Sequence, residues 1–206
     1  MALSKKVKQR IFTVFFMFAV SVFFIGIISA VYLATKKTVI RNESLFIKRS
    51  VLYTAGITPP EAPAEIESMF SAKVTEFKDG NGKNSYYAVK RDDGTQIYVI
   101  VANGRGLWGE IAGHVGLDST LTKITGIDFT LQSETPGLGA RIAEDWFREQ
   151  FRGMTGPVKR VAEGTKDNKS DEFDAITGAT ITSAAVEKMV NGTLEKAQSV
   201  VSGGEK

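Results

Sequence analysis

Asp174-Ala175-Ile176-Thr177-Gly178-Ala179-Thr180-Ile181-Thr182-Ser183 is a turn between a polar stretch, residues 166–172, and a helical pattern over residues 183–201. Gly178 and Ala179 have small side chains, so a ligand can come close to the main chain here. The first turn of the following helix offers N–H groups without intrahelical partners, which suit a phosphate. Thr180 would present its side-chain oxygen at the same place. An ordinary strand-to-helix turn with a hydroxyl cap is the commoner meaning of so short a motif.

The residues after this turn predict a helix, and most of those before it predict a sheet. Residues 183–201 carry apolar side chains three and four positions apart, typical of a helix packed on a core (Val186, Met189, Val190, Leu194, Ala197 and Val201). Earlier in the chain the apolar period is two, and Asp93-Gly94 is a strong hairpin signal. The predicted strands are residues 73–77, 86–90, 96–102, 107–117 and 123–131. We therefore expect an α+β fold, an antiparallel sheet with packed helices.

Three shorter elements complete this expectation. Residues 64–70 predict a helical piece after the proline-rich stretch 58–63, which is a rigid connector. Residues 143–151 resemble a helix with an aromatic apolar side, and residues 158–161 predict a short strand.

The N-terminal part of the chain has the composition of a membrane segment. Residues 11–34 are 24 residues without a charge, enough to cross a bilayer as a helix. We predict one retained transmembrane helix, because secretory signals have shorter apolar cores, although Ala30 and Ala34 leave cleavage as an alternative. Four basic residues precede the span and three follow it closely, which favours a cytoplasmic N-terminus by a narrow margin.

Charge and residue usage exclude several classes of function. Residues 1–41 hold seven Lys and Arg and no acid, so residues 42–206 carry 19 basic and 23 acidic side chains, and no basic patch indicates nucleic acid. The chain has no cysteine, which excludes disulfides, thiolate-held clusters and cysteine zinc sites. His114 is the one histidine and is best interpreted as structural or surface-exposed, so we expect neither a metal site nor a catalytic triad.

A second motif, Ser133-Glu134-Thr135-Pro136-Gly137-Leu138-Gly139-Ala140, lies between the predicted sheet and the helix at 143–151. Pro136, Gly137 and Gly139 predict a tight turn with exposed main-chain groups. Glu134 and Thr135 beside Leu138 suit the edge and face of a flat heterocycle. An ordinary connecting loop remains the alternative.

The order of three motifs behind an N-terminal membrane helix resembles one family over essentially the whole chain. Gly104-Arg105-Gly106-Leu107-Trp108-Gly109, then Glu134-Thr135-Pro136-Gly137-Leu138-Gly139, then Asp174-Ala175-Ile176-Thr177-Gly178-Ala179-Thr180 is similar to the C subunit of the sodium-translocating NADH:quinone reductase (Nqr) and the G subunit of the Rnf complex. The resemblance divides the chain into a basic tail (1–10), a transmembrane helix (11–34), a membrane-proximal helix and proline-rich connector (35–71), an FMN-binding domain (72–202) and a disordered tail (203–206).

The resemblance also implies a cofactor and its contacts. FMN would be esterified through its phosphate to Thr180, with the phosphate end lined by Thr177, Gly178, Ala179, Thr182 and Ser183. The isoalloxazine would be approached by Glu134, Thr135, Leu138 and Gly139. Asp174 matches the residue that starts the recognition sequence of a flavin transferase. Ile181 departs from the small hydroxylic residue of many relatives, which puts one hydrogen bond to the phosphate in doubt.

The implied function is electron transfer within an ion-translocating membrane oxidoreductase complex of Rnf or Nqr type, with no catalytic residue of this chain's own. Expected partners are the other subunits of such a complex and the transferase that matures this one. The flavin domain is expected on the extracytoplasmic side of the inner membrane. Alternatives are a flavin domain of another electron transfer chain, an unflavinylated scaffold or binding module, and a phosphate-ester hydrolase. The sequence does not decide between Rnf and Nqr or between Na⁺ and H⁺.

Overall fold

The computed structural model describes residues 5–167 and 171–203 and divides the chain into two compact units, Met1–Ser44 and Leu45–Lys206. The expected tails therefore lie partly outside the described residues, at 1–4 and 204–206, and so does part of the polar stretch 166–172. Each unit is described by itself.

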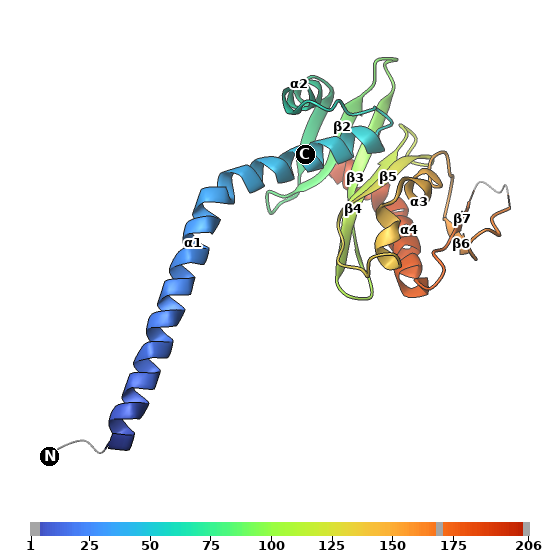
Figure 1. Ribbon diagram of the computed structural model, residues 1–206. Coiled ribbons are helices and arrows are strands. Elements are labelled where there is room, and N and C mark those ends of the chain that lie inside the picture. The colour runs from blue at the N-terminus through green and yellow to red at the C-terminus, as the bar shows by residue number, and fades with distance from the viewer. Residues whose placement is uncertain (1–4, 168–170, 204–206) are drawn as a thin grey trace. The chain divides into compact units, whose positions relative to one another are not determined.

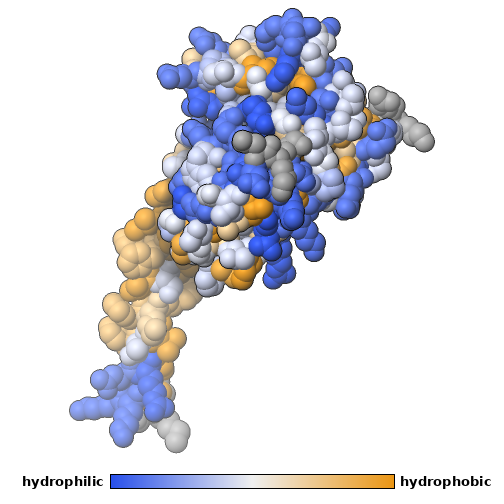
Figure 2. All heavy atoms as spheres, turned by 90° about the vertical axis from the view of Figure 1, so that its right-hand side faces the viewer, coloured by the Kyte–Doolittle hydropathy of each residue, from blue (hydrophilic) through white to orange (hydrophobic). Residues whose placement is uncertain are grey.

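The first unit is helical. It holds most of α1 (Lys5–Thr54), and the apolar side chains of residues 11–34 are exposed there. In Figure 2 this segment is mainly orange, and its N-terminal end is blue. Among the described residues, α1 is the one helix long and apolar enough to cross a membrane by length and composition.

The second unit is built on a five-stranded antiparallel sheet whose strands lie side by side in chain order (Figure 1). This confirms the α+β prediction. The strands are β1 (Val74–Lys78), β2 (Asn84–Lys90), β3 (Gln96–Arg105), β4 (Glu110–Leu117) and β5 (Ile124–Leu131). The predicted strand 107–117 begins too early, because Leu107 and Trp108 form a two-residue turn closed by the Gly106 N–H, which donates to the Gly109 carbonyl at 2.8 Å.

Helices cover both faces of the sheet, and side chains along each strand alternate between them. On β3, Ile97 and Val99 pack with the end of α1 and with α2 (Pro63–Lys73), whereas Ile100 and Ala102 pack with α4 (Thr180–Gly203). Two apolar cores result, one on each face. A strand buried on both faces has a less regular polar alternation than a half-exposed one.

The last turns of α1 belong to the second unit and are bonded to the sheet. Ser50 Oγ lies 2.7 Å from His114 Nδ1, and Thr125 Oγ1 donates to the Thr54 carbonyl at 2.9 Å. A Cβ at Gly116 would lie 2.5 Å from the Thr54 carbonyl oxygen, so a glycine permits the close approach of helix and strand here. The structure thus places residues 45–71, which belong to the expected membrane-proximal helix and proline-rich connector, in the same unit as the sheet.

The remaining elements follow β5. A 3₁₀ turn, η1 (Gly139–Ala143), precedes the one-turn helix α3 (Asp145–Glu149), so the helix predicted over 143–151 is shorter than expected. The predicted strand near 158–161 is β6 (Lys159–Val161), which pairs in parallel with β7 (Glu172–Asp174). The three-residue β7 has no alternating run long enough to be found in the sequence. The turn that precedes α4 follows directly after β7.

Candidate functional site

Thr180 opens α4 and is exposed. The turn before it is closed by the Ala179 N–H, which donates to the Ile176 carbonyl at 3.0 Å, and Gly178 adopts a φ of +78° that favours glycine. The Ser183 N–H donates to the Ala179 carbonyl at 3.0 Å, so the N–H groups of residues 180–182 come before the first N–H that is bonded within the helix. Positive helix-dipole charge and donors for an anion therefore coincide beside the Thr180 hydroxyl.

The next two hydroxyls of the motif point into the protein. Ser183 is buried, and its Oγ accepts from the Ile176 N–H at 3.0 Å. Thr182 is also buried, and its hydroxyl donates to Glu134 Oε2 at 2.5 Å. Of the three hydroxyls at 180, 182 and 183, only that of Thr180 belongs to an exposed residue, whereas the other two hold the turn in shape.

Glu134 brings three segments together. Its residue is only 5% exposed, its Oε1 accepts from the Trp108 N–H at 3.0 Å, and its Oε2 accepts from Thr182. A Cβ added at Gly106 would lie 2.5 Å from Glu134 Oε1, and one at Gly139 would lie 2.6 Å from Thr182 Oγ1. The glycines of two motifs thus leave room for one carboxyl group, which joins the β3–β4 turn, the loop after β5 and the first turn of α4.

Exposed apolar side chains gather on the segments that meet at this junction. In the described part of the chain beyond α1, the exposed large hydrophobic residues are Leu107, Trp108, Leu131, Leu138 and Ile181. The segments that carry Leu107, Trp108, Leu138 and Ile181 are in contact: Trp108 Nε1 donates to Thr135 Oγ1 at 3.0 Å, and Leu138 Cδ2 lies 3.1 Å from the Cβ position of Gly178. Leu131 ends β5, just before the loop that holds Leu138. We call these five residues the apolar rim.

Sequence reasoning placed Leu138 at the site but did not include the other four members of the rim. For Leu107 and Trp108 a signal was present, since two large apolar residues between Gly106 and Gly109 occupy a tight turn that usually holds polar ones. Ile181 stood out in the sequence only as a departure from relatives. Its exposure on the first turn of α4 places it beside Thr180.

Asp174 is held by the main chain of a neighbouring loop. Its Oδ1 accepts from the N–H groups of Thr165 and Lys166 at 3.2 and 3.0 Å. Its own N–H donates to Gln150 Oε1 at 2.8 Å. The carboxyl group is therefore engaged within the folded chain.

Thr177 is exposed, and its N–H donates to Glu163 Oε2 at 2.7 Å. This hydrogen bond lowers the pKa of the Glu163 carboxyl group below its ordinary value. Arg141 Nη2 lies 3.4 Å from Glu163 Oε1. An acid and a base that the sequence did not single out thus support the turn before α4.

The arrangement suits a flat heterocycle that carries a phosphate. Anion-binding N–H groups and one accessible hydroxyl lie at the start of α4, and exposed apolar side chains lie on the adjoining segments. Within residues 5–167 and 171–203, no group of three or more His, Cys, Asp or Glu side chains could hold a metal ion.

Comparisons with known proteins point to the same region. The sequence profile of the FMN-binding domain family matches residues 106–195, which include the β3–β4 turn, the loop after β5 and the start of α4. The G subunit of the proton-translocating ferredoxin:NAD(+) oxidoreductase complex of Clostridium ljungdahlii is 34% identical over 127 residues, 62% of this chain and 67% of that protein. The C subunit of the Na(+)-translocating NADH-quinone reductase of Vibrio alginolyticus is 28% identical over 154 residues, 71% of this chain and 54% of that protein.

Solved structures agree in fold. The C subunit of the Na(+)-translocating NADH-quinone reductase of Parabacteroides distasonis superposes with a TM-score of 0.67 at 24% identity, covering 80% of this chain and 96% of that one. NqrC of Shewanella oneidensis gives a TM-score of 0.66 at 20% identity, covering 75% and 91%. At these identities the structures show the fold alone. Taken with the profile match and the Clostridium relative, they show that this chain belongs to the family of FMN-binding subunits that contains the G subunit of Rnf and the C subunit of Nqr.

Proposed function

We propose that this chain is an electron-carrying subunit of an ion-translocating oxidoreductase complex of Rnf or Nqr type, with FMN esterified through its phosphate to Thr180 Oγ1. α1 anchors the chain in the inner membrane, and the second unit lies on the extracytoplasmic side. The chain spans between about half and two thirds of the length of the relatives quoted above, whose names give the complexes to which those proteins belong.

One observation carries the proposal. Four of the five large apolar side chains that remain exposed beyond α1 in the described residues, Leu107, Trp108, Leu138 and Ile181, lie on the three segments joined by Glu134, beside the accessible hydroxyl at the start of α4. Soluble surfaces rarely leave contiguous apolar side chains exposed without a ligand or partner. A flavin ring against the rim and a phosphate at the helix start would use both features together.

The side chains of this chain bind and orient the cofactor. When bound, FMN supplies the electron-accepting and electron-donating chemistry that these residues lack. The N–H groups at the start of α4 would hold the phosphate, Gly178 and Ala179 would let it approach, and Thr135 and Leu138 would border the ring. Glu134, Thr182 and Ser183 would keep these parts in register through the hydrogen bonds described above.

Attachment would require a separate enzyme. A threonine hydroxyl is a weak nucleophile without a positioned base or metal. Asp174, the nearest acid of the motif, is bonded to the N–H groups of Thr165 and Lys166. We propose an FAD-dependent flavin transferase that recognises the segment from Asp174 to Thr180.

The test is the mass of the full-length chain isolated from membranes that also contain the transferase. We expect an FMN-sized increment in the parent chain and in Thr155→Ala, and its complete loss in Thr180→Ala. Thr155 is the matched control, because it is an exposed threonine outside the segment from Asp174 to Thr180. An increment that persists in Thr180→Ala would move the attachment elsewhere, and a parent chain without any increment would favour an unmodified binding module.

A further inference from the structure

The half of β3 that leads to the site has one open edge. β3 pairs with β4 as far as Arg105, but its pairing with β2 ends at Ile100. The register of β2 shifts at the bulge opposite Phe77 and Lys78, and β2 begins at Asn84. A bulge bends and twists its strand. Among the described residues, no strand is paired with residues 101–105 of β3 on the β2 side.

The main-chain groups at this edge have a defined direction. The Gly106 N–H donates to the Gly109 carbonyl, so with alternating antiparallel pairing the even-numbered residues of β3 bond to β4. The Arg91 N–H donates to the Thr95 carbonyl, which by the same alternation directs the odd-numbered residues toward β2. The N–H and C=O groups of Asn103 and Arg105 thus point to the side where β2 is missing.

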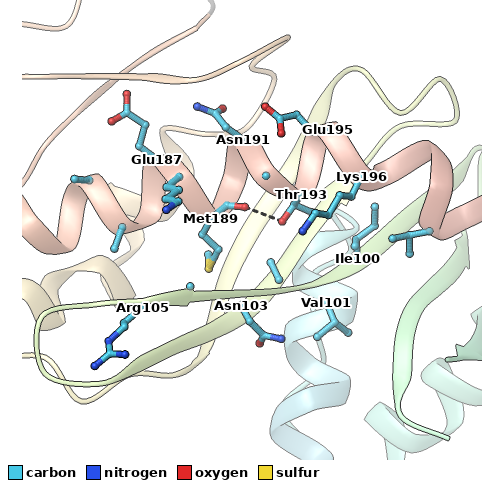
Figure 3. A pocket seen from close by; sticks show the side chains of 17 residues that line it. Ile100, Val101, Asn103, Arg105, Glu187, Met189, Asn191, Thr193, Glu195 and Lys196 are labelled. Carbon is cyan, nitrogen blue, oxygen red and sulfur yellow. Dashed lines mark hydrogen bonds between the residues drawn. The ribbon is translucent and has the colours of Figure 1, made fainter. Parts of the chain in front are cut away.

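A groove follows this edge and separates it from α4. It has a volume of about 890 Å³ and runs from Ile100 to Arg105 along β3 and from Ala184 to Val200 along α4. In Figure 3 α4 lies along β3, and Met189 points from the helix toward the strand. Small residues widen the groove on the helix side, since a Cβ added at Gly192 would meet no atom within 4 Å.

The charges that border the groove are mainly positive. Arg105, Lys188 and Lys196 line it, and all three are exposed. Of the two acids among its lining residues, Glu187 is bonded to Arg160 Nε at 2.8 Å. Glu187 and Glu195 both point away from β3 in Figure 3.

We propose that the open edge of β3 receives an extended, acidic segment of a partner protein, which pairs with Asn103 and Arg105 as an added strand. Strand addition uses main-chain hydrogen bonds for affinity and alternate side chains for specificity. Alternate side chains of the added strand would face α4, where Lys188 and Lys196 lie, and the others would lie on the side of Arg105. Acidic residues complement both sides.

The groove also leads to the candidate site. Gly104 and Arg105 line both this groove and the neighbouring hollow bounded by Leu107 and Trp108. A segment bound along β3 would therefore end beside the apolar rim. Main-chain pairing and charge at this edge do not depend on a flavin at Thr180. Thr180→Ala should therefore leave binding of the partner segment to β3 unchanged.

Hydrogen exchange of the full-length chain tests the pairing. The amides of Asn103 and Arg105 should exchange fast in the isolated chain and about tenfold or more slowly in the complex purified from native membranes, because each gains an acceptor. Ala102 and Gly104, already bonded to β4, should change little. Equal exchange of Asn103 and Arg105 in the two states, or a chain that purifies alone, would overturn the proposal.

Variants distinguish strand addition from contact of another kind. Asn103→Pro removes the edge N–H without removing a bond to β4 and should release the chain from the complex, whereas Asn103→Ala keeps the N–H and should remain bound. Lys188→Glu combined with Lys196→Glu should weaken assembly, and Lys90→Glu, on an exposed residue of β2, should not. Circular dichroism confirms that each variant is folded.

Photo-crosslinking from position 188 identifies the occupant. With a photoreactive residue at Lys188, peptide mass spectrometry should locate the cross-link in an acidic stretch of a different protein of the complex. Cross-links to a second copy of this chain, to a basic segment or to lipid would refute the assignment.

Discussion

At the residue scale, the candidate site depends on the space that two glycines leave for the Glu134 carboxyl group. A Cβ at Gly139 would lie 2.6 Å from Thr182 Oγ1 and 2.9 Å from Glu134 Oε2, and both neighbours are buried. Gly139→Ala should therefore lower the free energy of unfolding by about 1–3 kcal/mol through overpacking. Urea unfolding of the full-length chain in detergent measures this loss.

Gly192→Ala is the matched control for Gly139→Ala. A Cβ at Gly192 meets nothing within 4 Å, and the residue lies inside α4, where alanine is favoured over glycine by up to about 1 kcal/mol. The two substitutions should thus shift stability in opposite directions. An unchanged urea midpoint in Gly139→Ala would contradict this expectation, because it would show that Glu134 and Thr182 can move aside without a loss of stability.

The motifs in the sequence predicted which residues meet at the site but not how each side chain is directed. Thr182, Ser183 and Glu134 were expected to contact the cofactor, and the structure shows their polar groups bonded to one another or to the main chain. The type and spacing of residues in a motif do not reveal the direction in which each side chain points. Whether these residues also touch the cofactor stays a prediction.

At the element scale, the sheet was predictable and the docking of the last turns of α1 was not. Alternating residues and Asp93-Gly94 mark the strands and one turn directly in the sequence. The docked end of α1 buries only its last few positions, among them Val51 and Leu52, against residues of α2 and the sheet. So short a buried stretch gives only a rough helical period in the sequence.

The pairing of α1 with the sheet should depend on pH through His114. Burial lowers the pKa of this imidazole from 6.5 to about 4, and the attraction of Asp128 opposes the shift only in part. Between pH 4 and pH 6.5, His114 therefore binds a proton more readily in the unfolded chain than in the folded chain. The contribution of His114 to stability is therefore fully present above pH 6.5 and falls as the pH drops toward 4, by about 2–3 kcal/mol at pH 4.5.

Urea unfolding of the full-length chain at pH 7 and pH 4.5 checks this expectation against His114→Asn. The variant can keep a hydrogen bond to Ser50 but has no titrating group, so its stability should change less over this range. The hydrogen bond from Arg152 lowers the pKa of Glu149 from 4.5 to about 2. Glu149 therefore contributes to the pH dependence of stability mainly below pH 4.5. Parallel pH dependence in parent and variant would assign the effect to other groups.

At the scale of the whole molecule, charge and apolar character are separated along the chain. The seven basic residues of positions 1–41 flank the apolar stretch 11–34, and the remainder of the chain has a net charge of about −4. The formal net charge of +3 for the whole chain therefore reflects the anchor region and not the domain that carries the site. The same flanking charges give little information on orientation, because they are nearly balanced on the two sides of the span.

Orientation can be measured directly because the chain contains no cysteine. A single cysteine at Ser199, an exposed residue on α4, should react with a membrane-impermeant maleimide in intact cells whose outer membrane has been made permeable, if the second unit is extracytoplasmic. Gln9→Cys, before the apolar stretch, is the matched control and should react only after the inner membrane is opened. Labelling of Gln9→Cys in intact cells with Ser199→Cys protected would reverse the proposed topology. Labelling of Ser199→Cys in a chain released to the soluble fraction would indicate a cleaved signal in place of an anchor.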